Sequence, residues 1–306
     1  MNLSFAPLEG ITTYTYRNTH FEMFGGCDYY FAPFITPTKS EKVGIKSFRD
    51  VVPENNTAPL IPQLLANDAD AFWEFSKKLK GFGYKEVNLN LGCPSSTVVK
   101  KGRGAGFLQF PDLLDAFLDR IFSECDVEIS IKTRTGFLSH DEFDRLLEIY
   151  SKYPIKSLTI HPRTRSDFYN NAPALEPFLR ACRELDFPVI YNGDIFSKED
   201  FDRFLSVSPI DSVMLGRGAL KNPAIFREIK GGERLKTAEL IDFHHKLSER
   251  YLEVLGCEVY TLHKLKELWM YIMWNFPEEK KVLKAIKKSS RLSDISSAIM
   301  ALPELN

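Results

Sequence analysis

The sequence lacks the patterns that mark disulfide-bonded, zinc-binding and membrane-spanning proteins. Its five cysteines are an odd, scattered set, and no two of them have Cys-x-x-Cys spacing, so neither a disulfide framework nor a zinc site is expected. No apolar run approaches the length of a membrane span. The start, MNLSFAPLEG, lacks the basic residues and long apolar run of a signal peptide. These absences predict a reduced, cytoplasmic protein without a bound metal or a membrane anchor.

The sequence also lacks a net charge that would reveal its partners. It has 40 Lys plus Arg against 41 Asp plus Glu, so any surface for a polyanion must be a local patch. The 306 residues are 44% hydrophobic and 26% charged, an ordinary globular composition. This length suits one large α/β barrel with an appendage or two average domains, and we take a monomer as the default.

Eight short apolar runs, rich in strand-forming residues, recur through the first two thirds of the chain. They lie at 3–8, 29–34, 59–65, 86–92, 128–134, 157–163, 188–194 and 212–218. Segments with helical period separate them, and Asp68 and Ser197 stand where the N-caps of two such helices are expected. Strands that alternate with helices pair in parallel, because parallel neighbours need a crossover connection. The pattern predicts a closed (β/α)₈ TIM barrel, with a doubly wound open sheet as the structural alternative.

The pattern changes at Gly231-Gly232, after which only helices are expected. They are predicted at about 237–255, 260–274, 278–289 and 294–301. We therefore predict a barrel domain over 1–232 and a C-terminal all-helical domain over 233–306.

Polar residues occur at or just beyond the carboxyl ends of most predicted strands, although the strands of a barrel core are expected to be apolar. They are Gln63, Asn88, Asn90, Cys93, Lys132, Arg134, His161, Arg163, Asn192, Asp194 and Arg217. Each alone is more simply explained as a buried hydrogen-bonding residue. Together they predict one shared site, because ligand and catalytic groups of TIM barrels gather at this face.

Glycines after the last two strands suggest the kind of ligand. Gly193 follows the seventh strand, and Gly216 and Gly218 flank Arg217 after the eighth. Loops at these places in barrels commonly bind phosphate, so a phosphate-bearing cofactor is expected. Lys132 on the fifth strand could then stabilise negative charge on a reduced cofactor ring, or form a structural ion pair.

Cys93 differs from cysteines that merely pack in a core. It lies in a Gly/Pro/Ser loop at the rim of the predicted site, where a thiol can act as a nucleophile or as a general acid. Glycines at 102, 104 and 106 make the following segment a candidate mobile loop.

Seven strings in this order resemble the dihydrouridine synthase family. They are APLEG (6–10), NLNLGCPS (88–95), GRGAGFL (102–108), IKTR (131–134), HPRTR (161–165), NGDI (192–195) and LGRGAL (215–220). The resemblance covers the whole predicted barrel and, more loosely, the helical tail. The chain departs from the family at Leu8, where a methionine is usual.

The resemblance implies an oxidoreductase that reduces uridine in tRNA to 5,6-dihydrouridine. It implies flavin mononucleotide (FMN) as cofactor and NADPH or NADH as reductant. The residues that would bind FMN are Pro7, Leu8, Glu9, Gln63, Lys132, His161, Asn192, Gly193, Asp194, Gly216 and Arg217. Reduced flavin would deliver hydride to C6 of uracil, and Cys93 would donate the proton to C5 as a general acid.

A basic stripe in the tail, together with residues near the site, predicts the tRNA surface. Lys280, Lys284, Lys287, Lys288 and Arg291 fall on one helical face with no acid between them, which favours phosphate contact over a merely solvated face. Substrate or tRNA contacts are also expected at Asn90, Lys100, Arg103, Arg163 and Arg165. The tail string TLHKLKELWMYI resembles the bacterial class that acts at position 16 of the D-loop.

Two other functions stay open from the sequence. One is an FMN-dependent reductase of a free pyrimidine, similar to dihydroorotate dehydrogenase, which would not need a basic tail. The other is a non-catalytic tRNA-binding protein, which would not need Cys93 or the phosphate loops.

Overall fold

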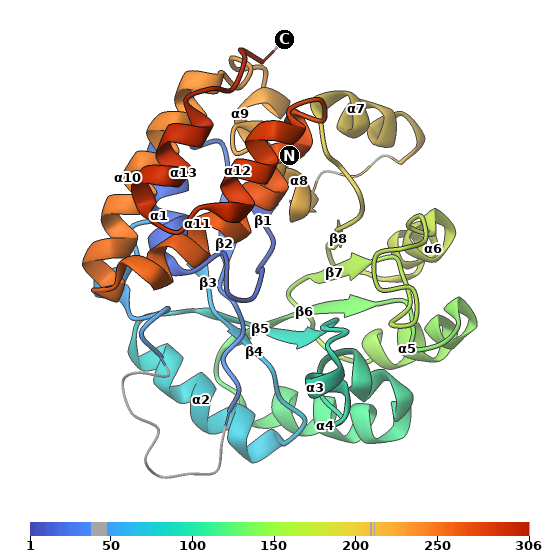
Figure 1. Cartoon of the computed structure of the whole chain (residues 1–306). Helices are drawn as coiled ribbons and strands as arrows, with labels where there is room; N and C mark the ends of the chain where they lie inside the picture. Colours follow the sequence, from blue (N-terminus) through green and yellow to red (C-terminus); the bar gives the residue numbers. More distant parts are fainter. Residues whose placement is uncertain (38–47, 209, 211, 306) are drawn as a thin grey trace.

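The computed structural model describes residues 1–37, 48–208, 210 and 212–305 and shows a parallel barrel surrounded by helices (Figure 1). Its strands are β1 (Asn2–Phe5), β2 (Tyr29–Phe31), β3 (Leu60–Ile61), β4 (Gln63–Leu64), β5 (Glu86–Leu91), β6 (Glu128–Arg134), β7 (Leu158–His161), β8 (Val189–Tyr191) and β9 (Ser212–Leu215). All pairings between these strands are parallel, as crossover connections through helices require.

An interruption at Pro62 divides one strand of the barrel into β3 and β4. The sheet runs β3-β2-β1-β9-β8-β7-β6-β5-β4, so its two ends are consecutive in the chain. Leu60 pairs with Tyr30 on one side, and Gln63 pairs with Asn88 on the other. Proline has no N–H to donate, but its carbonyl accepts from the Asn88 N–H at 2.9 Å. β3 and β4 therefore act as one strand that closes an eight-position barrel, which confirms the predicted TIM barrel.

The helices and short turns that follow the strands form the outer layer of the barrel. The helices are α1 (Tyr14–Met23), α2 (Ala69–Gly81), α3 (Ser96–Val99), α4 (Pro111–Glu124), α5 (Phe143–Tyr150), α6 (Leu175–Glu184), α7 (Lys198–Val207), α8 (Arg217–Lys221) and α9 (Ile225–Ile229), with 3₁₀ turns η2 (Pro53–Asn55), η3 (Gly104–Gln109) and η4 (His140–Glu142). Both predicted caps are present. Asp68 accepts from the Ala71 N–H at 3.0 Å, and Ser197 accepts from the Asp200 N–H at 3.1 Å.

The rest of the chain is helical, as expected, and packs against the barrel. It comprises α10 (Thr237–Leu255), α11 (Glu258–Ile272), η5 (Met273–Asn275), α12 (Lys280–Lys288) and α13 (Leu292–Ile299). Phe243 of α10 meets Tyr16 and Phe24 of the α1 region edge-on, at 5.7 and 5.1 Å between ring centroids. One large hydrophobic cluster runs from the barrel into these helices, and a smaller cluster of Ala6, Phe31, Ile61 and Met214 lies apart from it. The domain boundary at 232/233 stays a prediction.

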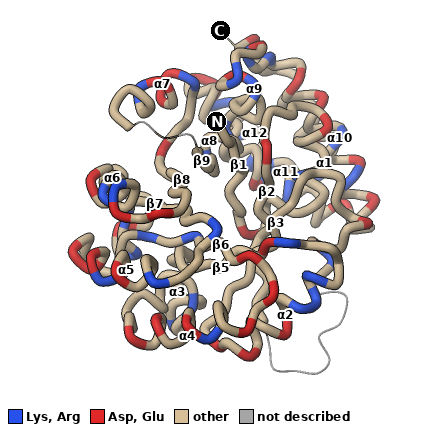
Figure 2. The backbone as a smooth tube through the Cα atoms, turned by 180° about the vertical axis from the view of Figure 1, so that it is seen from behind, with Lys and Arg blue, Asp and Glu red and all other residues tan. Residues whose placement is uncertain are grey.

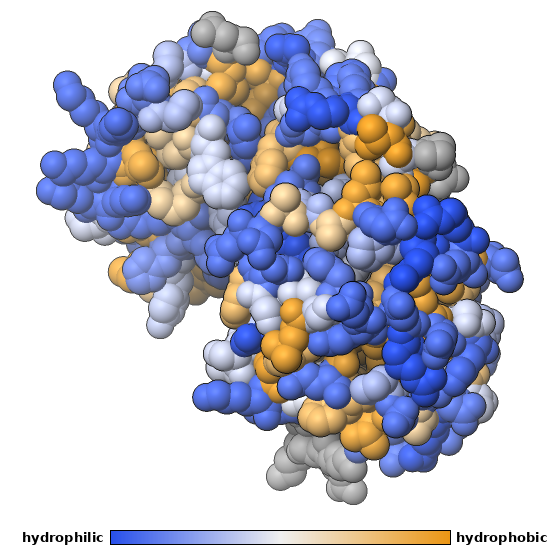
Figure 3. Space-filling view, turned by 90° about the vertical axis from the view of Figure 1, so that its right-hand side faces the viewer, coloured by the Kyte–Doolittle hydropathy of each residue, from blue (hydrophilic) through white to orange (hydrophobic). Residues whose placement is uncertain are grey.

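The surface shows no dominance of one charge. Lys and Arg alternate with Asp and Glu over the outer helices in Figure 2, in agreement with the balanced composition. Figure 3 shows a largely hydrophilic face with scattered hydrophobic patches and a notch between two lobes. Within the described ranges, no helix is both long and apolar enough to cross a membrane.

Candidate active site

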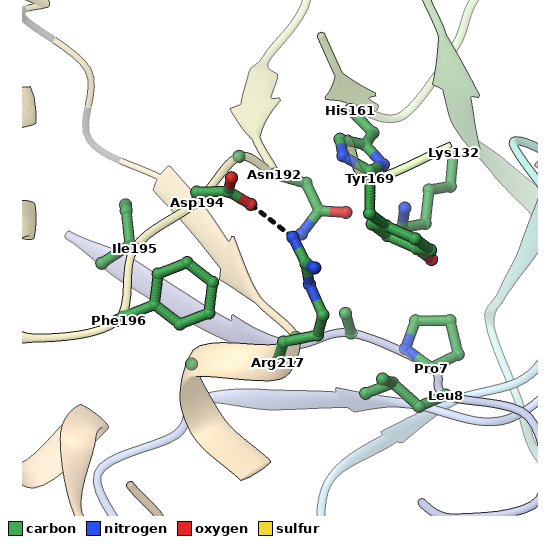
Figure 4. A pocket seen from close by; sticks show the side chains of 14 residues that line it. Pro7, Leu8, Lys132, His161, Tyr169, Asn192, Asp194, Ile195, Phe196 and Arg217 are labelled. Carbon is green, nitrogen blue, oxygen red and sulfur yellow. Dashed lines mark hydrogen bonds and ion pairs between the residues drawn. The ribbon is translucent and has the colours of Figure 1, made fainter. Parts of the chain in front are cut away.

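A pocket opens at the carboxyl ends of the barrel strands, where the sequence predicts one shared site (Figure 4). It is lined by Ala6, Pro7, Leu8, Lys132, His161, Tyr169, Asn192, Gly193, Asp194, Ile195, Phe196, Gly216, Arg217 and Gly218. The structure thus brings together nine of the eleven predicted FMN residues from β1, β6, β7, β8, β9 and the loops that follow them. Glu9 and Gln63 do not line this pocket, and the flavin contacts of all eleven residues stay predictions.

The charged side chains of the pocket are Lys132, Asp194 and Arg217, while its histidine is neutral. Burial, followed by the nearby Arg134 charge, lowers the pKa of Lys132 to about 7. Burial and the surrounding cations, Arg134 first, hold the pKa of His161 well below its ordinary value. At neutral pH the His161 ring is therefore an uncharged hydrogen-bonding and stacking group.

Asp194 joins two arginines at one wall of the pocket. Arg163 contacts both of its carboxylate oxygens, with Nη1 at 3.0 Å, and Arg217 Nη2 lies 2.7 Å from Oδ1. Burial alone would raise the pKa of Asp194, but the hydrogen bonds and charges of Arg163 and Arg217 bring it below its ordinary value. The carboxylate therefore stays ionised and orients both guanidinium groups.

Arg163 is placed differently from what its predicted substrate role suggests. Its side chain is only 2% exposed, and it also donates to the Asn171 carbonyl at 2.6 Å. In this arrangement Arg163 is buried and fixes the orientation of Asp194 in the pocket wall. Its contact with the substrate stays a prediction.

Two glycines of the phosphate-type loops are required by close packing. A Cβ on Gly193 would lie 2.0 Å from the Tyr191 hydroxyl, and one on Gly218 would lie 1.9 Å from the Ile195 carbonyl oxygen. No side chain fits at either position, so these loops can approach each other and a ligand closely.

Cys93 is held in a loop that a buried amide network supports. Asn90 Oδ1 accepts from the N–H groups of Gly92 and Cys93 at 3.1 and 2.9 Å. Asn90 Nδ2 donates to Gln63 Oε1 at 2.7 Å, and Gln63 Nε2 donates to Asn88 Oδ1 at 2.7 Å. Gln63 is fully buried and uses both ends of its amide, which explains why it does not line the pocket.

The segment after Cys93, which the sequence suggests as a mobile loop, is packed against Cys93. Residues 104–108 of η3 are buried, and the Ala105 N–H donates to the Cys93 carbonyl at 3.1 Å. Gly104 has a φ of 54°, and a Cβ there would lie 2.9 Å from the Cys93 oxygen. The glycines thus allow close approach, and the mobility of the segment stays a prediction.

The Cys93 thiol is protonated at neutral pH. Burial is the main cause that raises its pKa above the ordinary value, and the charge of Glu9 adds to it. The backbone at Ser95 and the charges of Arg134 and Lys132 oppose this shift only in part. A protonated thiol near the pocket cations suits a proton donor better than a nucleophile.

Arg134, which the sequence places at the shared site without a specific role, and Tyr169, to which the sequence assigned no role, complete the site. Arg134 is buried and donates to the Gly92 carbonyl at 2.9 Å and to the Phe168 carbonyl at 3.0 Å, so it joins the Cys93 loop to the loop after β7. Tyr169 lies against His161 and over Arg217, with the guanidinium 4.4 Å from its ring. Phe168, next to Tyr169, has a φ of 50°, which is unusual for a bulky residue. No sequence signal places Tyr169, because the path of a loop depends on distant contacts.

The predicted tRNA residues are mostly on the surface. Lys280, Lys284, Lys287, Lys288 and Arg291 are all exposed, while Val282 and Ile286 bury the opposite face of α12. Arg291 pairs with Asp294 at 3.4 Å. Lys100 is exposed, Arg103 donates to Asn67 at 3.1 Å, and Arg165 stacks 4.7 Å from the Phe168 ring. Their RNA contacts stay predictions.

The described part of the chain contains no group of three or more His, Cys, Asp or Glu side chains placed to hold a metal ion.

Comparison with known proteins identifies a family that matches nearly the whole chain and relatives that match about three quarters of it. The family model described as dihydrouridine synthase matches residues 4–300. The tRNA-dihydrouridine synthase B of Escherichia coli (strain K12) is 28% identical over 239 residues, which cover 77% of this chain and 73% of that protein. The protein of the same name from Pasteurella multocida (strain Pm70) is 29% identical over 228 residues, or 72% and 67% of the two chains. Among solved structures, N-(5'-phosphoribosyl)anthranilate isomerase from Pyrococcus furiosus aligns with a TM-score of 0.46 at 16% identity, covering 75% of this chain and 96% of that one.

Proposed function

Because the chain belongs to the dihydrouridine synthase family, we propose that it reduces specific D-loop uridines of tRNA to 5,6-dihydrouridine with FMN and NADPH or NADH. The observation that carries the proposal is the position of Cys93. Its thiol is protonated, its backbone N–H donates to Asn90, and Lys132 is near enough to influence the pKa of the thiol. A proton donor beside a cationic pocket is what the reduction of a uracil ring requires.

The residues of the pocket fit a flavin mononucleotide. Pro7 and Leu8 offer an apolar wall for a planar ring, and Lys132 supplies a cation near it (Figure 4). Asn192 donates to the Met214 carbonyl at 2.7 Å, so its oxygen is turned toward the pocket and can accept from a ribityl hydroxyl. Gly193, Gly216 and Arg217 would hold the phosphate. The phosphate is a dianion, and a cation together with the backbone N–H groups of glycine loops suits it.

The residues of the chain position and protonate the uracil. A bound reduced flavin would supply the hydride that C6 receives. Cys93 donates the proton to C5, and its raised pKa keeps that proton in place at neutral pH. Asn90 fixes the Cys93 backbone, and Arg134 fixes the carbonyl of Gly92 beside it. A uridine must leave its stack to reach this site, at a cost of a few kcal/mol that is lowest for an unpaired loop base.

The helical region is proposed to hold the tRNA. The exposed basic face of α12 supplies Lys280, Lys284, Lys287 and Lys288 as phosphate contacts. The two relatives described above carry the name of synthase B, and the resemblance to the class that acts at position 16 stays a prediction that mapping of the product would decide.

The test compares wild type, Cys93→Ala and Cys182→Ala, each with FMN, NADPH and unmodified tRNA. Cys182 is an exposed cysteine on α6 and serves as the matched control. We expect all three proteins to bind flavin, and wild type and Cys182→Ala to form dihydrouridine at similar rates. Loss of the general acid lowers the rate of Cys93→Ala by about 10²- to 10⁴-fold. If wild type binds flavin but leaves tRNA unchanged and reduces a free pyrimidine, the proposal fails in favour of a small-substrate reductase.

A further inference from the structure

A row of aromatic side chains leads from the pocket to the helical region. The guanidinium of Arg217 lies 4.4 Å from the Tyr169 ring and 5.6 Å from the Phe196 ring. Phe196 meets Trp274 of η5 at 5.9 Å between centroids, and Trp274 meets Tyr271 of α11 at 5.3 Å. Tyr169, Phe196 and Arg217 line the pocket, so these five side chains, here called the aromatic bridge, connect it to the helices.

Trp274 presents its ring to solvent from a fixed backbone. Its side chain is 45% exposed, whereas Trp269 on α11 is fully buried. The next residue, Asn275, donates to the Lys221 carbonyl of α8 at 2.6 Å and to the Ile272 carbonyl at 3.1 Å, and Met273 on the other side is 4% exposed. A large apolar ring that stays open to water on an anchored turn is better suited to contact a partner than to fill a core.

The position of the aromatic bridge indicates what this partner is. One end is the wall of the pocket formed by Phe196 and Arg217, at the carboxyl ends of the strands where the proposed site lies. The other end is η5, directly before α12 with its exposed lysines. Trp274 contacts Phe196 of the pocket wall and precedes α12 in the chain, so it is close to an RNA strand that contacts α12 and reaches toward the site. Unpaired RNA bases stack on aromatic rings and on arginine planes, and basic residues track the backbone beside them.

We propose that the exposed ring of Trp274, which Phe196 supports edge-on, forms a stacking platform for an unpaired tRNA base that flanks the target uridine. This inference rests on the proposed function, because the occupant is the RNA that carries the uridine. The platform would hold the neighbouring base while the target base is turned into the pocket, which offsets part of the stacking lost on flipping. It would also favour uridines in unpaired segments, because a base in a duplex is not available to stack.

The test replaces Trp274 with Leu and with Phe in the full chain loaded with FMN. Leucine keeps an apolar side chain but has no ring face, whereas phenylalanine keeps the face. Tyr260→Ala is the control, because Tyr260 is a 62% exposed aromatic residue on α11 that is outside the aromatic bridge. The dissociation constant for unmodified tRNA and the KM for tRNA in dihydrouridine formation are measured for each protein.

We expect Trp274→Leu to raise both constants by about 5- to 150-fold, the range for loss of one base–aromatic stack. Trp274→Phe should stay within about threefold of wild type, and Tyr260→Ala should match wild type. The platform is rejected if Trp274→Leu binds tRNA as wild type does, or if Trp274→Phe is as weak as Trp274→Leu. If wild type binds tRNA but forms no dihydrouridine, the proposed function fails, and the comparison of the Leu and Phe variants by binding still decides the platform.

Discussion

The side chain of Asn90 and the backbone of Cys93 are joined by a hydrogen bond, in which Asn90 Oδ1 accepts from the Cys93 N–H at 2.9 Å. The same amide donates to Gln63 at its other end. Asn90 is 6% exposed, so its orientation is set by the barrel interior and is passed on to the loop that carries the thiol. This relationship makes Asn90 a positioning residue for Cys93, in addition to its predicted contact with uracil.

Replacement of Asn90 by Ala should lower kcat for dihydrouridine formation by about 5- to 100-fold, the effect of losing one or two buried hydrogen bonds that hold the reacting group. If Asn90 acts through Cys93, the KM for tRNA changes little and the rate at which the thiol is alkylated changes with kcat. Asn88→Ala is the matched control, because Asn88 belongs to the same network but bonds to Gln63 and Ser130. An increase in KM with kcat unchanged would instead show that Asn90 acts on the substrate alone.

Affinity for FMN should fall as the pH rises above neutrality, because of Lys132. In the free protein Lys132 has a pKa of about 7, so it is charged below this pH and neutral above it. An anionic ligand binds the charged form better, so binding takes up a proton and affinity drops by up to about tenfold per pH unit above 7. Titration of flavin fluorescence from pH 6 to 9 measures this dependence.

The control for Lys132 is a pair of methionine variants. Lys132→Met should weaken FMN binding at pH 6 and remove most of the pH dependence. Lys156 is an exposed lysine just before β7 that pairs with Glu128. Lys156→Met should leave both the affinity for FMN and its pH dependence unchanged. An unaltered pH profile in Lys132→Met would show that another group titrates.

Loss of charge on α12 should reduce the dependence of tRNA binding on salt. The double variant Lys284→Ala/Lys287→Ala removes two exposed cations of the basic face. If both contact phosphate, the slope of log K against log salt becomes shallower by about 1.4 to 1.8. Lys80→Ala/Lys156→Ala removes two lysines that form exposed ion pairs outside the helical region, and such pairs contribute little to stability. Equal slopes for the two double variants would contradict a role of α12 in binding tRNA.

The free energy of unfolding should fall as the pH is lowered below about 6.5, in part because of His244. Burial, followed by the neighbouring His245, lowers the pKa of His244 to about 4. Neutral His244 accepts from Trp269 Nε1 at 3.1 Å. Since the unfolded chain binds the proton more readily, stability is lost as pH falls through this range, by about 2 kcal/mol between pH 7 and 5 for this residue.

Urea unfolding at pH 7 and pH 5 measures the contribution of His244. On acidification from pH 7 to pH 5, the free energy of unfolding of His244→Gln should fall by about 2 kcal/mol less than that of wild type. His263→Gln, at an exposed histidine of α11, should keep the wild-type difference between the two pH values. Identical behaviour of wild type and His244→Gln would exclude His244 as the cause.

Several features of the site could be predicted from the sequence because they are local. A strand, its polar last residues and the helix that follows lie within about thirty residues of each other, and parallel order places all carboxyl ends at one face. Lys132, His161, Asn192, Asp194 and Arg217 therefore meet in one pocket, as their positions in the sequence predict.

Other features depend on contacts between distant parts of the chain, and only the tertiary structure decides them. Pro62 interrupts a strand without opening the barrel, because the half before it, β3, pairs with β2 and the half after it, β4, pairs with β5. Gly104 allows close packing on Cys93, since the loop folds back on itself. Tyr169 lies at the pocket because Arg134 donates a hydrogen bond to the carbonyl of the preceding residue, Phe168. Trp274 contacts Phe196 although 78 positions separate them in the sequence. Sequence periodicity records which side of a strand or helix is buried, but the direction of a loop is set by distant groups that accept its hydrogen bonds and fill the space beside it.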